Sequence, residues 1–104
     1  MQVLTNTDKR VHGDERLAAI VETVVTAALE RFTAQITRVE VHLSDENGSK
    51  GGGNDKRCVM EARVEGRPPT AVSHKAATVE EAMHGAADKL ARSLESTLGR
   101  LREF

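Results

Sequence analysis

The stretch TVEEAMHGAADKLARSL, residues 78–94, predicts an amphipathic helix that closes the chain. It begins with a capping box, in which the Thr78 hydroxyl accepts a hydrogen bond from the third helical amide and Glu81 reaches back to the cap. The side chains that we expect to be buried on one face are Val79, Met83, Ala86, Leu90, Leu94, Thr97 and Leu101. A neighbouring stripe holds Lys89, Arg92, Ser96 and Arg100. Such a helix needs an apolar surface to pack against.

Three runs before this helix alternate in the manner of half-buried strands. Residues 36–44 place Val39, Val41 and Leu43 on one face and Arg38, Glu40 and His42 on the other. Residues 56–64 place Cys58, Met60, Ala62 and Val64 on one face and Arg57, Val59, Glu61 and Arg63 on the other. Residues 70–75 form a shorter run. The connections 45–55 and 66–69 are rich in glycine or proline, which predicts an antiparallel meander with one buried face.

The first 35 residues predict one more strand and one more helix. Residues 3–5 read as a short strand, and a helix capped by Gly13 or Asp14 continues to about Phe32. Its apolar residues follow three- and four-residue steps: Leu17, Ile20, Val21, Val24, Val25, Ala28, Leu29 and Phe32. A helix between two strands allows them to pair in parallel through a right-handed crossover. We therefore expect an α+β fold of order β-α-β-β-β-α, with two helices on one face of a four-stranded sheet, in a single domain over residues 1–104.

The composition restricts the classes of function. Charged residues make up 30% of the 104 residues and the net charge is −1, so binding to nucleic acid would need the basic residues gathered on one patch. Aromatic residues make up only 2%, which argues against binding by base stacking. A single cysteine excludes an internal disulfide, and we find neither an apolar signal segment nor a run that could span a bilayer. These features predict a cytoplasmic protein without membrane contact.

Motifs for chemistry are weak throughout the sequence. Gly51-Gly52-Gly53 joins two strands rather than a strand and a helix, so a plain hairpin loop is favoured over a phosphate-binding loop. Acidic and amide residues in that connection lack the spacing of a calcium loop, and four histidines lack the paired spacing of a zinc site. Cys58 lies within the apolar alternation, which predicts a buried, unreactive thiol. We therefore predict no enzyme activity, metal, cofactor or small-molecule substrate.

The basic stripe on the last helix has two interpretations. It could be an edge that binds RNA, or a solvated helix face on which Asp88 and Arg92 pair four residues apart. Three further basic residues are nearby in sequence and potentially on the open sheet face. They slightly favour the interpretation as an RNA-binding edge. The candidate RNA-binding residues are Lys89, Arg92, Arg100, Lys75, Arg57 and Arg63.

The chain resembles the ribosome hibernation promoting factors, also called ribosome-associated inhibitors, over nearly its whole length. The resemblance rests on the element order, on Ile36-Thr37-Arg38-Val39-Glu40-Val41-His42-Leu43 after a helix ending at Phe32, and above all on the last helix. There the family runs Asp-Met-Tyr-Ala-Ala-Ile-Asp and then Asp-Lys-Leu. This chain has Thr78-Val79-Glu80-Glu81-Ala82-Met83-His84 and then Asp88-Lys89-Leu90-Ala91-Arg92-Ser93-Leu94.

The resemblance implies a fold similar to double-stranded RNA-binding domains and a function without catalysis. It implies binding to the small ribosomal subunit and its rRNA, in the channel of messenger and transfer RNA, which inhibits translation under stress or in stationary phase. The family's RNA contacts on the last helix would fall on Lys89 and Arg92, and less directly on Arg100. The chain is expected to correspond to the family's short form, without the dimerisation domain of the long forms, and to be a monomer off the ribosome.

Two departures from the family keep a second function open. Family members carry lysines on the outer face of the first helix, at positions that residues such as Val24 and Ala27 hold in this chain. The outer face here shows Glu22 and Glu30, and Glu80 stands in place of the family's tyrosine. A diverged paralogue of the same fold could instead regulate a protein partner, in the manner suggested by the older description of family members as sigma-factor modulators.

Overall fold

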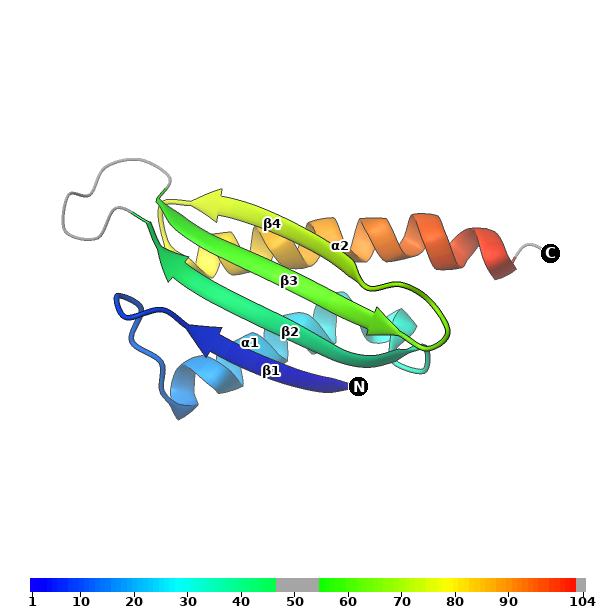
Figure 1. Cartoon of the computed structure of the whole chain (residues 1–104), viewed down its shortest axis with the longest axis horizontal. Coiled ribbons are helices and arrows are strands. Elements are labelled where there is room, and N and C mark those ends of the chain that lie inside the picture. Colours follow the sequence, from blue (N-terminus) through cyan, green and yellow to red (C-terminus); the bar gives the residue numbers. More distant parts are fainter. Residues whose placement is uncertain (47–54, 103–104) are drawn as a thin grey trace.

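The computed structural model describes residues 1–46 and 55–102, with side chains through Leu98. The elements are β1 (Gln2–Thr7), α1 (Glu15–Ala28), a 3-10 turn η1 (Glu30–Phe32), β2 (Ile36–Asp45), β3 (Lys56–Val64), β4 (Thr70–Ala76) and α2 (Val79–Arg102), shown in Figure 1. The sheet has the order β1-β2-β3-β4; β1 runs parallel to β2, and the other neighbours are antiparallel. This arrangement confirms the predicted β-α-β-β-β-α fold.

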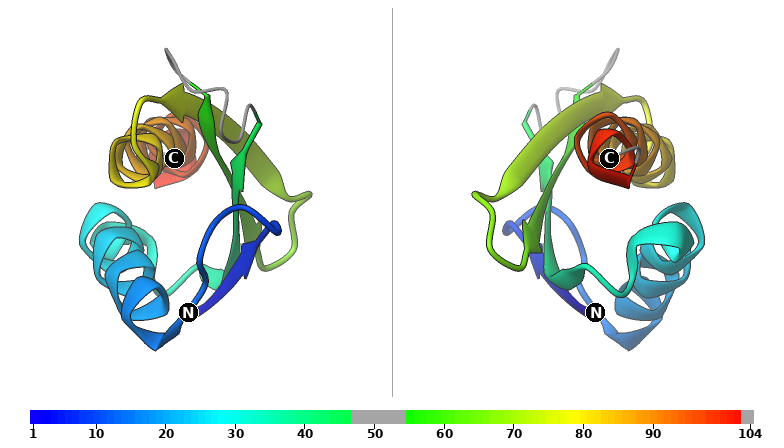
Figure 2. Two further views of the ribbon diagram at one scale, coloured as in Figure 1. Left: turned by 90° about the vertical axis from the view of Figure 1, so that its left-hand side faces the viewer. Right: turned by 90° about the vertical axis from the view of Figure 1, so that its right-hand side faces the viewer.

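Both helices cover the same face of the sheet, and the other face is open (Figure 2). The alternation in β2 and β3 decides which face is buried, because neighbouring residues in a strand point to opposite sides. Val39, Val41 and Leu43 of β2 and Cys58, Met60 and Ala62 of β3 are at most 2% exposed. Their counterparts on the helices are Val21, Val25 and Leu29 before β2, and Ala82, Met83, Ala86, Ala87, Leu90 and Leu94 on α2.

Both helices begin at side-chain caps. Asp14 Oδ1 accepts a hydrogen bond of 2.9 Å from the Leu17 amide, which decides between the two predicted caps. Thr78 Oγ1 accepts one of 3.1 Å from the Glu81 amide, as predicted. The Glu81 carboxylate accepts a bond from the Thr78 hydroxyl at 3.1 Å, rather than one from the backbone amide of the cap.

The structure corrects the end of the first helix, the bounds of three strands and one helix face. The first helix ends at Ala28, and the 3-10 turn after Leu29 carries Phe32 into the core. At the end of α2, Leu98 is 6% exposed and Thr97 is only half-buried, so the buried face continues from Leu94 by a four-residue step rather than a three-residue step. The strands β1, β2 and β4 also extend beyond the predicted bounds. Gly51-Gly52-Gly53 lies outside the described residues.

The approach of α2 to β4 is close because Gly85 has no side chain. A Cβ atom at Gly85 would overlap the imidazole of His74, which lies on the inner face of β4 and is half-buried. Gly66 has a different role, because its φ of 74° opens the turn between β3 and β4. Among the described residues, no helix combines the length and the apolar character that a membrane span requires.

We predict that Thr78→Ala lowers the free energy of unfolding by about 1 kcal/mol, because the Glu81 amide loses its cap. Urea denaturation would measure the change. Thr23→Ala is the matched control, since the Thr23 hydroxyl bonds only to the Ala19 carbonyl within α1 at an exposed position. Equal effects of the two substitutions would contradict the assigned role of the cap.

Cys58 is predicted to react slowly with a thiol reagent in the native protein and rapidly after denaturation. Its side chain is fully buried, which confirms the expectation from the alternation, and burial raises the pKa of the thiol to about 12. At pH 8 the reactive thiolate is therefore almost absent from the folded state. Labelling with a chromogenic disulfide would measure both rates, and rapid labelling of the folded protein would contradict the burial.

Candidate nucleic-acid interface

The first basic cluster lies on the open sheet face at the end where β2 finishes. Arg57 of β3 stands directly opposite Lys75 of β4 in the strand register. Glu46 lies between them: its carboxylate contacts Lys75 Nζ at 2.8 Å and Arg57 Nη1 at 3.4 Å. The hydrogen bond from Lys75 is the largest cause that holds the pKa of Glu46 below its usual value; burial opposes it, and the charge of Lys75 and then the contacts with Arg57 add to it. At neutral pH this carboxylate is therefore charged and forms ion pairs with both Lys75 and Arg57.

Backbone contacts from the N-terminal segment hold Glu46 in place. Arg10 Nη1 donates hydrogen bonds to the carbonyls of Asp45 and Glu46, at 3.1 and 3.0 Å. Asp8 Oδ2 accepts a bond of 3.0 Å from the Asp45 amide, and the Glu46 amide donates one of 2.9 Å to the Asp55 carbonyl. Partial burial would raise the pKa of Asp8, but bonds from three amides, with Asp45 the largest contributor, lower it overall. The segment after β1 thus positions the acid that faces Arg57 and Lys75.

Beside this cluster, a partly buried ion pair closes the end of the sheet. Asp55 is 3% exposed, and its Oδ1 lies 2.9 Å from Lys56 Nζ. That ammonium group also lies 3.4 Å from Asp45 Oδ2. The hydrogen bond from Lys56 holds the pKa of Asp55 below its usual value. Lys56 points to the inner side of β3 and is neutralised there, so it adds nothing to the open face.

The second basic cluster lies at the other end of the open face. Arg38 of β2 stands opposite Arg63 of β3, and Glu40 stands opposite Glu61. Each arginine pairs with the glutamate two residues away on its own strand, at 3.7 Å for Arg38 and 3.4 Å for Arg63. Arg63 is therefore six strand residues, or about 20 Å, from Arg57. The sheet separates these two predicted residues rather than bringing them together.

Lys89 of α2 meets the free edge of β4. Its Nζ donates a hydrogen bond of 2.9 Å to the Ser73 carbonyl, and β4 is an edge strand of the sheet. Ser73 lies two residues before Lys75 on the same strand. The Lys89 ammonium group, which is exposed and keeps donors to spare, therefore continues the Arg57–Lys75 cluster around the sheet edge.

Arg92 lies one helical turn beyond Lys89 and is widely exposed. It pairs with Asp88 at 2.8 Å, four residues earlier on α2, as the solvated-face interpretation expects. The backbone of Arg100 belongs to α2, but its side chain lies outside the described part of the chain. We define the edge strip as Arg57, Lys75, Lys89 and Arg92.

The edge strip can bind phosphate groups but shows no means of reading bases. Exposed ion pairs such as Arg92–Asp88 contribute only about 0–1 kcal/mol, so a phosphate can replace the carboxylate at little cost. The described residues contain no aromatic side chain on this surface; Phe32 is buried. They also contain no group of three or more histidine, cysteine or acidic side chains arranged to hold a metal ion.

Two charged residues of the open sheet face are not among the candidates from the sequence. The alternation puts Arg38 on the open face, but only the strand register shows that it faces Arg63. Glu46 falls in a connection between strands, and its contact with Lys75 joins residues 29 positions apart. No periodicity in the sequence carries information about such a contact. Glu22 and Glu30 are exposed, which agrees with an acidic outer face of the first helix.

Comparison with a family model shows the family of the chain, and comparison with solved structures shows its fold. A family model described as Sigma 54 modulation protein / S30EA ribosomal protein matches residues 4–102. Searching curated protein sequences yields no significant match.

Two solved structures are similar to the chain over almost its full length. The N-terminal domain of Protein Y from Thermus thermophilus gives a TM-score of 0.75 at 18% identity, covering 93% of this chain and 99% of that domain. A ribosomal subunit interface protein from Coxiella burnetii gives a TM-score of 0.58 at 14% identity, with 100% of each chain covered. At these identities the likeness establishes the fold.

We predict that Glu46→Gln tightens binding to duplex RNA several-fold at low salt, because it releases Arg57 and Lys75 for phosphate. The salt dependence of the affinity should steepen by about one to two log units per log unit of salt. Fluorescence anisotropy would measure both quantities. Glu65→Gln changes the net charge equally in the exposed turn after β3 and should have a smaller effect. Equal RNA affinities of the Glu46→Gln and Glu65→Gln variants would show that Glu46 does not compete with RNA.

Proposed function

Because this chain belongs to the Sigma 54 modulation protein / S30EA ribosomal protein family, we propose that it is a ribosome-associated factor that binds the small subunit. In this proposal it occupies the channel of messenger and transfer RNA and inhibits translation under stress or in stationary phase. The family match over residues 4–102 is the observation that carries the proposal. The ribosomal subunit interface protein from Coxiella burnetii, which shares the fold, also supports a role at the ribosome.

The edge strip supplies the physical means of binding in this proposal. Its four cations run from the open sheet face around β4 to α2, so they can follow a backbone of rRNA phosphates. The contact requires no chemical step, cofactor or substrate, because occupancy alone excludes other RNA from the channel. Binding to ribosomes would place the protein in the cytoplasm, and we propose a monomer off the ribosome.

Binding through the edge strip would be reversible and strongly dependent on salt. Arg57 and Lys75 share Glu46, and Arg92 holds Asp88, so each phosphate contact replaces an existing ion pair. The net gain per contact is then smaller than for unpaired cations, while release of counterions from RNA still contributes. Such an interface favours a factor that leaves the ribosome when conditions change.

We predict that Lys89→Ala combined with Arg92→Ala weakens binding to small subunits and flattens its salt dependence by about one to two log units per log unit of salt. Both side chains are exposed, so the free energy of unfolding should change by only about 0.5 kcal/mol or less per site. Co-sedimentation with purified small subunits across a salt series would measure the effect.

Lys9→Ala combined with Arg67→Ala is the matched control for this experiment. It removes the same charge at exposed positions outside the edge strip. An equal loss of affinity in the two double variants would show that the effect comes from net charge and not from the edge strip. Absence of any binding by the unaltered protein to ribosomal particles at low salt would overturn the proposed function and favour a protein partner.

A further inference from the structure

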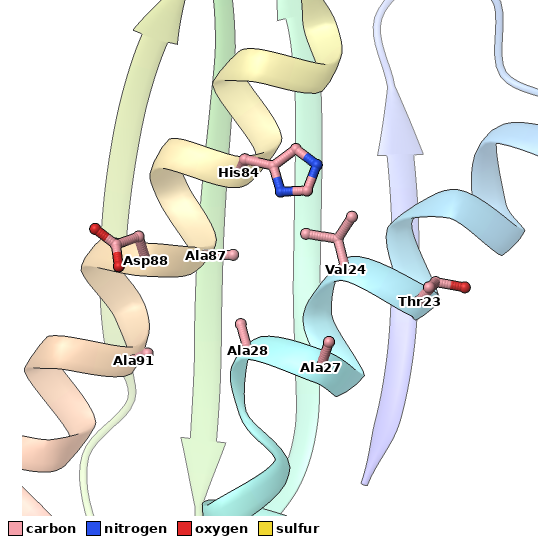
Figure 3. Close-up of a pocket in the computed structure, with 8 residues that line it drawn as sticks. All are labelled: Thr23, Val24, Ala27, Ala28, His84, Ala87, Asp88 and Ala91. Carbon is pink, nitrogen blue, oxygen red and sulfur yellow. The ribbon is translucent and has the colours of Figure 1, made fainter.

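The outer surface of the helical layer has a groove between α1 and α2. The part between the two helices has a volume of about 460 Å³ and is lined by Val24, Ala27 and Ala28 of α1 and by His84, Ala87 and Ala91 of α2. His84 and Ala87 face Val24 and Ala28 across it (Figure 3). Most of these side chains are small, so another backbone can come close to both helices.

The groove continues along the exposed side of α1. Two neighbouring depressions share Thr23 with the part of the groove between the helices. They extend the surface to Arg16 at one end and to Glu30 at the other. Fourteen residues separate these ends, which corresponds to about 21 Å along a helix. A surface of this length matches four turns of a third helix laid along the layer.

Carboxylates border the groove. Glu22 and Glu30 belong to the lining beside Ala27, and among the described residues neither has an ion-pair partner. Asp88 lies on the opposite rim and pairs with Arg92. The cation within the lining is Arg16, at one end. An apolar floor with acidic borders is complementary to an amphipathic helix with basic flanks.

We propose that this groove binds an amphipathic helix of a protein partner, with small or aliphatic residues on its inner face and lysine or arginine on its flanks. A second copy of this chain fits less well, because a two-fold contact along α1 brings Glu30 toward Arg16 of the other copy but supplies no cation from the lining to Glu22. RNA also fits poorly, since its phosphates would meet unpaired carboxylates.

The groove and the edge strip lie on different sides of α2. Ala87 and Ala91 face α1, whereas Lys89 is about 200° around the helix from Ala87 and reaches the β4 edge. One molecule can therefore hold RNA and a protein helix at the same time. This inference goes beyond the proposed function, because the edge strip proposed to bind rRNA does not include the floor of the groove.

The test uses a designed helical peptide of about 18 residues, with leucine and alanine at positions i, i+4, i+7 and i+11 and lysine on both flanks. We expect the peptide to shift the amide NMR signals of Thr23, Ala27 and Ala91. Ala27→Gln should weaken binding about tenfold or more, because the longer side chain fills the floor without changing charge. Glu22→Gln combined with Glu30→Gln should weaken it about two- to thirtyfold, as expected for two exposed ion pairs.

Matched controls separate this result from other modes of binding. A peptide with glutamate flanks should bind at least about tenfold more weakly. Lys89→Ala alone should leave peptide affinity unchanged, because Lys89 reaches the β4 edge and does not contact the carboxylates of the groove. Four results would overturn the inference: no shift at millimolar peptide, equal affinity of a scrambled lysine peptide, shifts of the same amides by duplex RNA, or self-association that Ala27→Gln abolishes. Ribosome binding by the variant with Lys89→Ala and Arg92→Ala tests only the proposed function, and its loss would not affect the inference about the groove.

Discussion

The burial of a single sheet face beneath α2 is the constraint on which the rest of this structure depends. Met60 of β3 and Met83 and Leu90 of α2 are fully buried at this contact. Because the chain has almost no aromatic residues, the core is filled by aliphatic side chains and alanines that let the helix come close to the strands. The close approach of α2 to β4 is evident at Gly85, because a Cβ atom there would overlap the side chain of His74. With one face covered, the other must remain polar, and it becomes available for binding.

The same constraint sorts the charges of a nearly neutral chain into two surfaces. Cations from β3, β4 and the flank of α2 collect around the free sheet edge, whereas carboxylates border the groove on the helical layer. α2 belongs to both surfaces, because its successive residues point in different directions. A net charge of −1 therefore does not preclude an RNA-binding surface, and an acidic first helix need not weaken it.

Ion pairs on the open face moderate the potential of the basic residues. Each of Arg38, Arg63, Arg57 and Lys75 has a glutamate within 4 Å. Two of these pairs join residues of one strand, while Glu46 reaches across to β3 and β4. Exposed pairs contribute little stability. Their main consequence is competition, because any ligand with phosphate groups must displace a carboxylate that the fold already holds in place.

The sequence by itself determined the local elements, the buried face and the caps. Periods of two and of about 3.6 residues are local properties, and so is a threonine hydroxyl three residues before a glutamate; these predictions held for β3, for Cys58 and for Thr78. Only the tertiary structure decided which exposed charges meet. Strand register placed Arg57 beside Lys75 and separated both from Arg63, and the packing of α2 brought Lys89 to the Ser73 carbonyl. Contacts between residues far apart in the chain depend on how the buried surfaces fit together, and a pattern along the sequence does not record that fit.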